Sequence, residues 1–149
     1  EQAGPVLILR KELRPDSGGA GRQRGGLGQF MSVSVAEGHE FDFSAMFDRV
    51  DHPAEGRAGG GDGAPTFIHQ DDGTAMRGKG RQFVPPGRTV VMGFPGGAGY
   101  GEARERDEQA VRRDLALGYI SAEAAERDYG LIRAAQDEVA AQVAAGEEF

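Results

Sequence analysis

The residues that could do chemistry in this chain are few and far apart. The sequence has three histidines, His39, His52 and His69, and no cysteine. Imidazole and thiolate groups are common metal ligands, bases and nucleophiles, and metal sites bring them together at short, regular spacings. The histidines follow no such spacing and the chain has no thiol, so we expect no metal site, no disulfide and no cysteine nucleophile.

The other reactive groups have simpler explanations. The neighbouring carboxylates Asp71–Asp72 and Glu147–Glu148 lie in a turn-like stretch and near the chain end, where solvation explains them better than acid–base catalysis. Ser17 lies beside Asp16, but no histidine is near it in the sequence and the GxSxG pattern of a nucleophilic serine is absent. We therefore expect Asp16 and Ser17 to form an Asx or ST turn that sets the surrounding loop.

The densest feature is the stretch PDSGGAGRQRGGLG at residues 15–28, which holds six glycines and two arginines. Glycine permits turns, bulges and a close approach of backbones that a side chain would block. Arg22 and Arg24 are one residue apart, so an extended chain would point both guanidinium groups the same way, toward carboxylates, phosphates or carbonyls. The residues alone favour glycine bulges with a surface ion pair over a ligand-binding loop, because neither GxxxxGK[ST] nor a helix-opening GxGxxG is present.

Short apolar runs broken by glycine predict strands over the first part of the chain. The runs are VLIL, FMSVSV, FDF, TFI and TVVMGF, at residues 6–9, 30–35, 41–43, 66–68 and 89–94. Val33 and Val35 alternate with serines, as in a half-buried strand, whereas the continuous run at 6–9 indicates a strand covered on both faces. The glycines of residues 54–65 favour a loop or lid. This region is therefore expected to be a β sandwich or barrel fragment.

The last part of the chain is predicted to be helical. Asp107 is a suitable N-cap for a helix that ends at Gly118, and Ser121 is one for a helix that ends at Gly130. A third, alanine-rich helix is expected over about residues 137–145, where two valines form a narrow apolar stripe. That stripe suggests packing against a partner or a frayed terminus.

Together these elements predict an α+β fold in one structural unit. A mainly β, glycine-rich domain at residues 1–101 is followed by a helical segment at residues 102–149 that packs on it. The net charge of -7 argues against binding to nucleic acid or to an anionic membrane. No apolar run approaches the roughly 20 residues that span a bilayer, and no secretion signal is present. A cytoplasmic location is expected.

Two motifs carry a resemblance to a known family. The run LRPDSGGAGRQRGGLG at residues 13–28 resembles the signature that opens the C-terminal part of the hydantoinase B family, which includes B subunits of N-methylhydantoinase, 5-oxoprolinase and the ketone carboxylases. The run FPGGAGYGEARERDEQAVRRDLALGYISAEAAERDYGL at residues 94–131 resembles that family's closing pattern, and AGGGDGAPTF between them is similar to its Gly-Gly-x-x-Gly-Ala-Pro loop. The resemblance covers only the end of a family member, so we expect a C-terminal piece, a processed fragment or a separately encoded subunit.

The resemblance implies an ATP-dependent enzyme of which this chain is one component. In the family, a B subunit and an ATP-binding A subunit activate a carbonyl oxygen by phosphorylation, then hydrolyse a cyclic amide or, in the ketone carboxylases, add a bicarbonate-derived carbon to an enolic substrate. The chain would be catalytically incompetent alone and bind no cofactor itself. It would form a hetero-oligomer with an A-type subunit and the remaining part of the B-type subunit, with ATP and a divalent metal in the complete enzyme.

Three functions stay open under this interpretation: a hydrolase component, a carboxylase component, and a non-catalytic assembly module whose helical end docks a partner. The glycine–arginine loop is the best candidate for a substrate or anion contact at the active-site rim. Its residues are Gly18, Gly19, Arg22, Arg24, Gly25 and Gly26. If the arginines instead pair internally with Asp16 or Glu12, replacing Arg22 with alanine would lower stability without changing substrate affinity. No catalytic residue is assigned.

Overall fold

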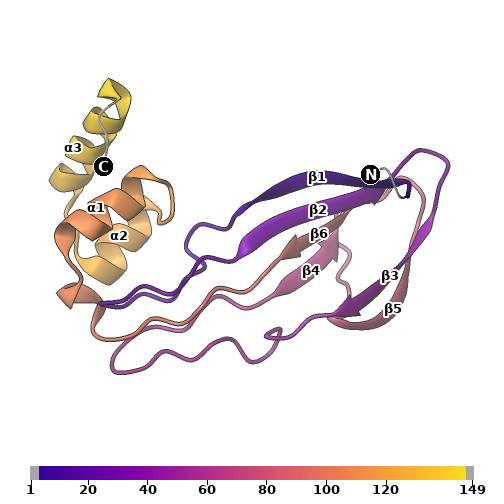
Figure 1. The fold of residues 1–149 in the computed structure, drawn as a ribbon, viewed down its shortest axis with the longest axis horizontal. Coiled ribbons are helices and arrows are strands. Elements are labelled where there is room, and N and C mark those ends of the chain that lie inside the picture. Colours follow the sequence, from indigo (N-terminus) through magenta and orange to yellow (C-terminus); the bar gives the residue numbers. More distant parts are fainter. Residues whose placement is uncertain (1–3, 147–149) are drawn as a thin grey trace.

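The computed structural model describes residues 4–146 and has strands at one end of an elongated molecule and helices at the other, joined by long segments that run side by side (Figure 1). The strands are β1 (Val6–Leu13), β2 (Gln29–Val35), β3 (Phe41–Met46), β4 (Phe67–Gln70), β5 (Lys79–Val84) and β6 (Val90–Gly93). The helical end comprises the 3-10 turn η1 (Ala103–Glu105), α1 (Glu108–Ala116), α2 (Ala122–Tyr129) and α3 (Arg133–Ala145). The predicted α+β fold, mainly β with C-terminal helices, is confirmed. No helix within residues 4–146 has the length and apolar character needed to cross a membrane.

The strands form two antiparallel sheets. The main sheet has the order β1-β2-β6-β4, and the small sheet pairs β3 with β5. Val33 of β2 pairs with Ile8 of β1 on one side and with Val90 of β6 on the other. The five predicted apolar runs all contribute to strands, but β5 is missing from the prediction because its sequence KGRQFV is largely polar and contains a glycine.

A cluster of apolar side chains fills the space between the two sheets. Its buried members come from β4, β5 and β6, and they are Ile68, Val84, Val90 and Met92. Phe43 of β3 packs against the cluster, and so do Phe47 and Phe94, whose ring centroids are 5.6 Å apart. The main sheet is open, with β1 and β4 at its edges. Two sheets around one core match the sandwich prediction better than the barrel prediction.

β1 departs from the prediction made for residues 6–9. The apolar run there predicts a strand covered on both faces, and a strand does form, but every residue of β1 is exposed. β1 pairs with β2 alone, so it is an edge strand within the described part of the chain. The prediction of cover is wrong for this chain because no layer formed by residues 4–146 lies over β1.

The helices begin and end largely where their capping residues predict. The Asp107 carboxylate accepts a hydrogen bond from the N–H three residues on at 3.0 Å, and the Ser121 hydroxyl does the same at 3.1 Å. Gly118 and Gly130 follow α1 and α2 with φ of +68° and +75°. These left-handed conformations are easy for glycine and end each helix.

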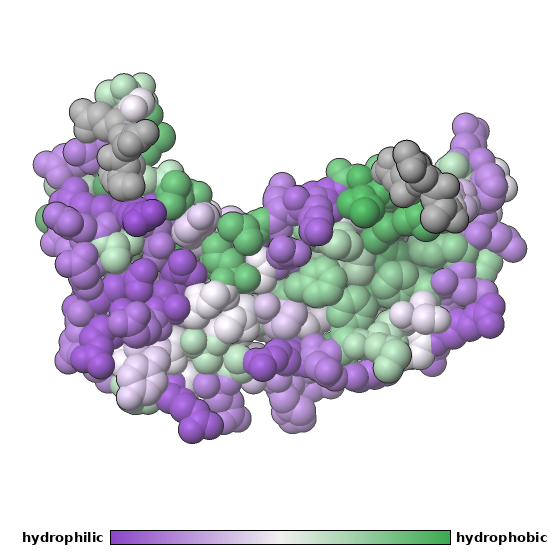
Figure 2. Space-filling view, in the orientation of Figure 1, coloured by the Kyte–Doolittle hydropathy of each residue, from purple (hydrophilic) through white to green (hydrophobic). Residues whose placement is uncertain are grey.

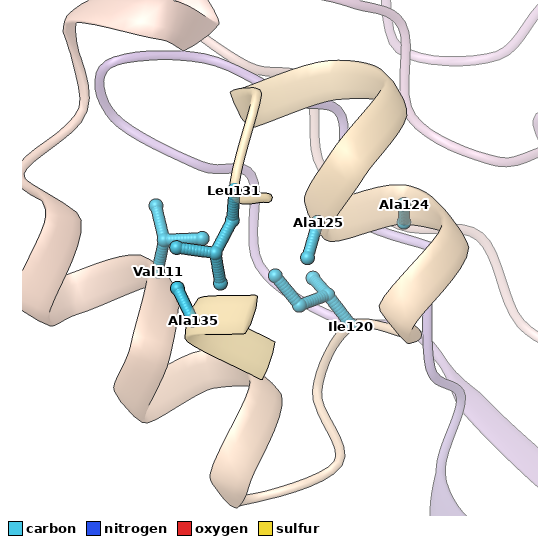
Figure 3. Close-up of a cluster of buried hydrophobic side chains, with 6 residues drawn as sticks. All are labelled: Val111, Ile120, Ala124, Ala125, Leu131 and Ala135. Carbon is cyan, nitrogen blue, oxygen red and sulfur yellow. The ribbon is translucent and has the colours of Figure 1, made fainter. Parts of the chain in front are cut away.

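The third helix begins earlier than predicted, at Arg133 rather than near residue 137, because alanine and glutamine extend it toward its N-terminus. Val139 on its inner face is buried, so its apolar stripe packs partly within this chain. Buried side chains from α1, α2, α3 and the connections between them form one apolar cluster (Figure 3). Its members are Val111, Ile120, Ala124, Ala125, Leu131 and Ala135.

Candidate functional site

The predicted glycine–arginine loop is part of a larger unit made of three glycine-rich segments. Residues 17–28, 54–64 and 95–101 run side by side between the sheets and the helices, and we call them the glycine-rich core (Figure 1). The middle segment, predicted as a loop or lid, has no regular secondary structure but is built into this core. The N–H of Gly61 donates to the carbonyl of Ala20 at 2.7 Å.

The glycines of the core allow backbone to lie directly against backbone. A Cβ atom on Gly18 would overlap the carbonyl of Gly25, and a Cβ atom on Gly25 would overlap a carbonyl of segment 95–101. A Cβ atom on Gly19 would overlap a carbonyl of the middle segment, whereas a Cβ atom on Gly26 would meet open space. None of these four glycines has a positive φ. Close approach, rather than turn geometry, is therefore what requires glycine at Gly18, Gly19 and Gly25.

Backbone hydrogen bonds join the segments of the core. The N–H of Gly19 donates to the carbonyl of Gly97, and the N–H of Gly97 donates to the carbonyl of Gly26, both at 2.9 Å. The N–H of Gly25 donates to the carbonyl of Gly19, also at 2.9 Å, so the first segment is doubled back on itself. Buried backbone polar groups need such partners. The core is thus a bonded platform and not a free loop.

Arg24 uses its guanidinium group within the chain. Its Nε donates to Oδ2 of Asp114 on α1 at 2.8 Å, and its Nη2 donates to Oδ1 at 3.3 Å. Its Nη1 donates to the carbonyl of Gly25 at 2.7 Å, and its Cζ lies 5.7 Å from the ring centroid of Tyr119. The Arg24 side chain is only 13% exposed. The anion that Arg24 meets in this chain is therefore the Asp114 carboxylate.

Arg106 completes a buried triad with Arg24 and Asp114. Its Nη2 donates to Oδ2 of Asp114 at 2.8 Å, and its Nη1 donates to the carbonyl of Arg22 at 3.3 Å. Its Nε is buried and has no hydrogen-bond partner among residues 4–146. A buried charge is strongly unfavourable unless it is paired, so each of the three groups depends on the other two. The triad fastens α1 to the glycine-rich core.

Tyr129, the last residue of α2, lies near the same triad. Burial raises the pKa of its hydroxyl, and the positive charges of Arg106 and Arg24 oppose that rise. An ordinary tyrosine is already neutral at about pH 7, and the raised pKa moves its ionisation to still higher pH. The second helix therefore contributes an uncharged group to this junction.

Arg22 is the exposed arginine of the predicted loop. Its side chain is 52% exposed, and its Nη1 lies 3.8 Å from Oε2 of Glu105, which makes a weak ion pair. The internal partners suggested by the sequence, Asp16 and Glu12, do not pair with either loop arginine. Glu12 pairs with Arg10 two residues away, and the Asp16 carboxylate accepts a hydrogen bond from the start of α2. Arg22 and Arg24 both turn toward the helical end but meet different carboxylates. Arg22 retains a solvent-facing guanidinium group.

Ser17 and Asp16 hold the base of the loop. The Ser17 hydroxyl donates to the carbonyl of Arg14 at 2.6 Å and accepts from the N–H of Gly28 at 2.8 Å, and the residue is buried. Ser17 therefore fixes the loop through these contacts and not through the predicted ST turn, which would need a bond from an N–H two residues on. Asp16 does not make the expected local turn, because its Oδ1 accepts from the N–H of Ser121 at 2.8 Å, an N–H group that lies at the start of α2.

Arg14 has a comparable role at the sheet end of the glycine-rich core. Its Nη1 donates to the carbonyls of Pro65 at 2.7 Å and Phe94 at 3.3 Å, and its Cζ lies 5.0 Å from the ring centroid of Phe67. Burial lowers the pKa of the Arg14 guanidinium below its ordinary value. Arg14 therefore holds two chain segments where they leave the core and meet the main sheet.

The remaining titratable residues do not assemble into a metal-binding cluster. Within residues 4–146, no group of three or more histidine, aspartate or glutamate side chains could hold a metal ion. Asp71 and Asp72 both lie beside Arg88, at 3.6 and 2.9 Å, in partly exposed ion pairs. The pair Glu147–Glu148 lies outside the described residues. Among the ion pairs of residues 4–146, those of the triad are the most buried.

Asp114 and Arg106 are not among the residues predicted from the sequence. A signal for Asp114 was present: it lies three residues after Val111 and just before Leu115, on the apolar face of α1. A carboxylate on such a face indicates a buried partner. The partner itself cannot be identified from local sequence, because Arg24 is 90 residues away from Asp114.

Comparison with known proteins gives consistent matches. The family model described as hydantoinase B/oxoprolinase matches residues 1–103. The chain is 34% identical over 132 residues to an uncharacterized protein of Methanocaldococcus jannaschii, covering 87% of this chain and 23% of that protein. It is 30% identical over 144 residues to the beta subunit of a caprolactamase of Pseudomonas jessenii, covering 89% of this chain and 24% of that relative. It is also 30% identical over 142 residues to the putative B subunit of a D-/L-hydantoinase of a Pseudomonas species, covering 91% and 24%.

Two solved structures share the fold. The ATP-dependent caprolactamase from Pseudomonas jessenii superposes with a TM-score of 0.73 at 25% identity, over 96% of this chain and 27% of that one. A nucleotide-free acetone carboxylase superposes with a TM-score of 0.67 at 19% identity, over 95% of this chain and 25% of that one, a likeness of fold alone. The chain spans about a quarter of the length of the proteins it matches.

Proposed function

This chain belongs to the hydantoinase B/oxoprolinase family, and from that membership we propose that it is the C-terminal portion of a B-type subunit of an ATP-dependent hydrolase of cyclic amides. The observation that carries the proposal is the match along nearly the whole chain to the beta subunit of a caprolactamase, supported by the fold it shares with the solved caprolactamase. The match to a hydantoinase component points to the same class of ring.

The proposed reaction needs ATP because a cyclic amide is a poor electrophile. Resonance between nitrogen and carbonyl stabilises the amide. Transfer of a phosphoryl group from ATP to the carbonyl oxygen makes the ring carbon electrophilic, so that water can add to it. The ring then opens as the C–N bond breaks and the nitrogen takes up a proton, which leaves an acyl phosphate. A second water hydrolyses the acyl phosphate to a carboxylate and inorganic phosphate. We assign ATP binding to an A-type subunit, and the divalent metal and catalytic groups to parts of the complex outside this chain.

Within the complex, we assign this chain a positioning role. The glycine-rich core is a bonded platform with two exposed arginines, Arg22 in the predicted loop and Arg57 in the middle segment. We propose that the loop of Gly18, Gly19, Arg22, Arg24, Gly25 and Gly26 borders an anion site. Arg22 would contact the anion directly, while Arg24 holds the loop in place through Asp114. The parts at residues 1–101 and 102–149 then work as one unit, since this ion pair crosses between them. On its own the chain would be inactive.

A variant of Arg22 tests this role. Replacing Arg22 with alanine should raise the KM of the complex for its anionic ligand by about tenfold, because a charge-assisted contact is worth about 1.5 kcal/mol. The melting temperature should stay unchanged, since the exposed pair with Glu105 is weak. Glu105→Ala is the matched control and should alter neither quantity. Unchanged KM in Arg22→Ala would contradict the anion contact.

A ketone carboxylase component is the second candidate, favoured by the fold shared with acetone carboxylase. The third is a non-catalytic assembly module whose helical end docks a partner. To distinguish them, we would purify the complex from its native source, which we place in the cytoplasm, and determine the intact mass of every chain. ATP-dependent opening of lactam or hydantoin rings supports the hydrolase, and ATP-dependent consumption of bicarbonate with a ketone supports the carboxylase. If the partners are intact and neither activity is found, both the hydrolase and the carboxylase candidates are contradicted.

A further inference from the structure

β1 carries an apolar surface that is uncovered in the described chain. Its exposed large apolar residues, with their exposed fractions, are Val6 (44%), Leu7 (37%), Ile8 (51%), Leu9 (59%) and Leu13 (46%). Figure 2 shows hydrophobic surface gathered over the strand end of the molecule, whereas much of the helical end is hydrophilic. Single exposed apolar side chains are ordinary, but four consecutive ones along one strand indicate an interaction surface.

The same strand has an open edge. β1 pairs with β2 on one side, and its other side has no strand partner within residues 4–146. Proteins usually protect such an edge with charges, prolines or a short strand. The second half of β1 has that protection, because Arg10, Lys11 and Glu12 are charged. The run at residues 6–9 has none, so the unprotected part of the edge coincides with the apolar part.

We propose that residues 6–9 of β1 dock a strand and an apolar layer contributed by the remaining part of a B-type subunit, an inference that rests on the proposed function. The matched relatives are about four times as long as this chain, so most of a B-type polypeptide lies outside it and is available as the occupant. The docking would complete the main sheet at its β1 edge.

The sequence of β1 distinguishes this occupant from a second copy of the chain. A continuous apolar run is typical of a strand that is covered on both faces as well as paired at its edge. Pairing between the β1 edges of two copies would extend the sheet but leave both faces of the strand exposed. A large folded remainder can provide a neighbouring strand and a covering layer together.

Hydrogen exchange on the native complex tests the proposal, with β2 of the same chain as an internal reference. β2 is paired on both sides, so its amides exchange slowly. If β1 is docked, those amides of residues 6–9 that point away from β2 should exchange within about threefold of the amides in β2, and if β1 is an open edge they should exchange at least about tenfold faster. Fast exchange at residues 6–9 would overturn the proposal.

A paired variant sharpens the test. Ile8→Lys combined with Leu9→Lys places charges on the exposed surface and should speed exchange at residues 6–9 by about tenfold or more in the complex. Met46→Lys is the matched control, since Met46 is an apolar strand residue that is 86% exposed on the small sheet, and it should leave β1 unchanged. An equal effect of both variants, or no effect of either, would overturn the proposal.

The intact masses of the same sample separate the two ways to fail. If the rest of a B-type subunit and ATP-dependent ring opening are present while residues 6–9 exchange rapidly, the proposed function stands and the docking inference fails. If no such remainder is present and the chain is a dimer with protected β1, the occupant is a second copy and both proposals fail.

Discussion

The glycine-rich core and the helical end of this molecule are stabilised in opposite ways. In the core, backbone packs on backbone. A carbonyl of one segment occupies the position where a Cβ atom would lie on a glycine packed against it. In the helical end, alanine, valine, leucine and isoleucine side chains pack around one another in a cluster (Figure 3). The core therefore depends on the absence of side chains, and the helical end on their presence.

This difference means that the two parts of the chain are sensitive to opposite changes in side-chain size. A methyl group added to the core must displace backbone atoms, which hydrogen bonds hold in place. A methyl group removed from the helical end leaves a cavity. The triad of Arg24, Asp114 and Arg106 joins the two parts. It is sensitive to the loss of a charge rather than to a change in side-chain size, because its stability depends on charge pairing.

The largest effect is expected from Gly25→Ala. The new Cβ atom would overlap backbone atoms of Gly97 and Ala98, which cannot turn aside as a side chain can. We expect the free energy of unfolding to fall by more than about 3 kcal/mol, or folding to fail. Gly26→Ala is the matched control, because its Cβ would meet open space. Chemical denaturation of both variants measures the difference in the free energy of unfolding. A Gly25→Ala protein as stable as the Gly26→Ala protein would contradict the close backbone packing described for the core.

The next effect is expected at the junction, from Asp114→Ala. Removal of this carboxylate leaves two largely buried guanidinium groups without their partner, which should cost about 3 to 5 kcal/mol. The exposed pair between Arg22 and Glu105 provides the control, and Glu105→Ala should cost less than about 1 kcal/mol. Thermal unfolding compares the two variants. Equal losses would mean that the triad does not fasten the helices to the core.

A smaller effect is expected in the helical end, from Leu131→Ala. Leu131 is buried in the apolar cluster, but its neighbours include small alanines on elements that can partly close the cavity. We expect a loss of about 2 to 3 kcal/mol. Leu117→Ala is the control, since Leu117 is 49% exposed, and it should cost less than about 1 kcal/mol. Denaturant titration gives both values, and a loss at Leu131 no larger than at Leu117 would contradict the packing described.

Much of the fold could be predicted because its signals are local. Asp107 and Ser121 cap their helices through hydrogen bonds that span three residues, and Gly118 and Gly130 end those helices by their own conformation. β5 was missed because its pairing with β3 compensates for a sequence with weak strand preference. The apolar run of β1 predicts a covered strand, but its cover is not formed by the described residues.

The candidate site could be predicted only in part, because its contacts are between distant segments. The sequence identified the glycines and arginines of residues 15–28 as the informative ones. It could not identify which backbone segment closes on Gly25, nor that Arg24 binds a carboxylate on α1. Such contacts depend on the tertiary arrangement and leave no local pattern. Whether Arg22 binds an anion stays a prediction.

The central claim is that residues without regular secondary structure form a rigid, bonded platform. Amide hydrogen exchange measured by NMR tests it most directly, at the N–H groups of Gly19, Gly25 and Gly97, each of which donates to a carbonyl in the core. We predict that these amides exchange as slowly as those of β2 and β6 in the main sheet. Exchange as fast as that of an exposed loop amide would contradict the platform and the positioning role built on it.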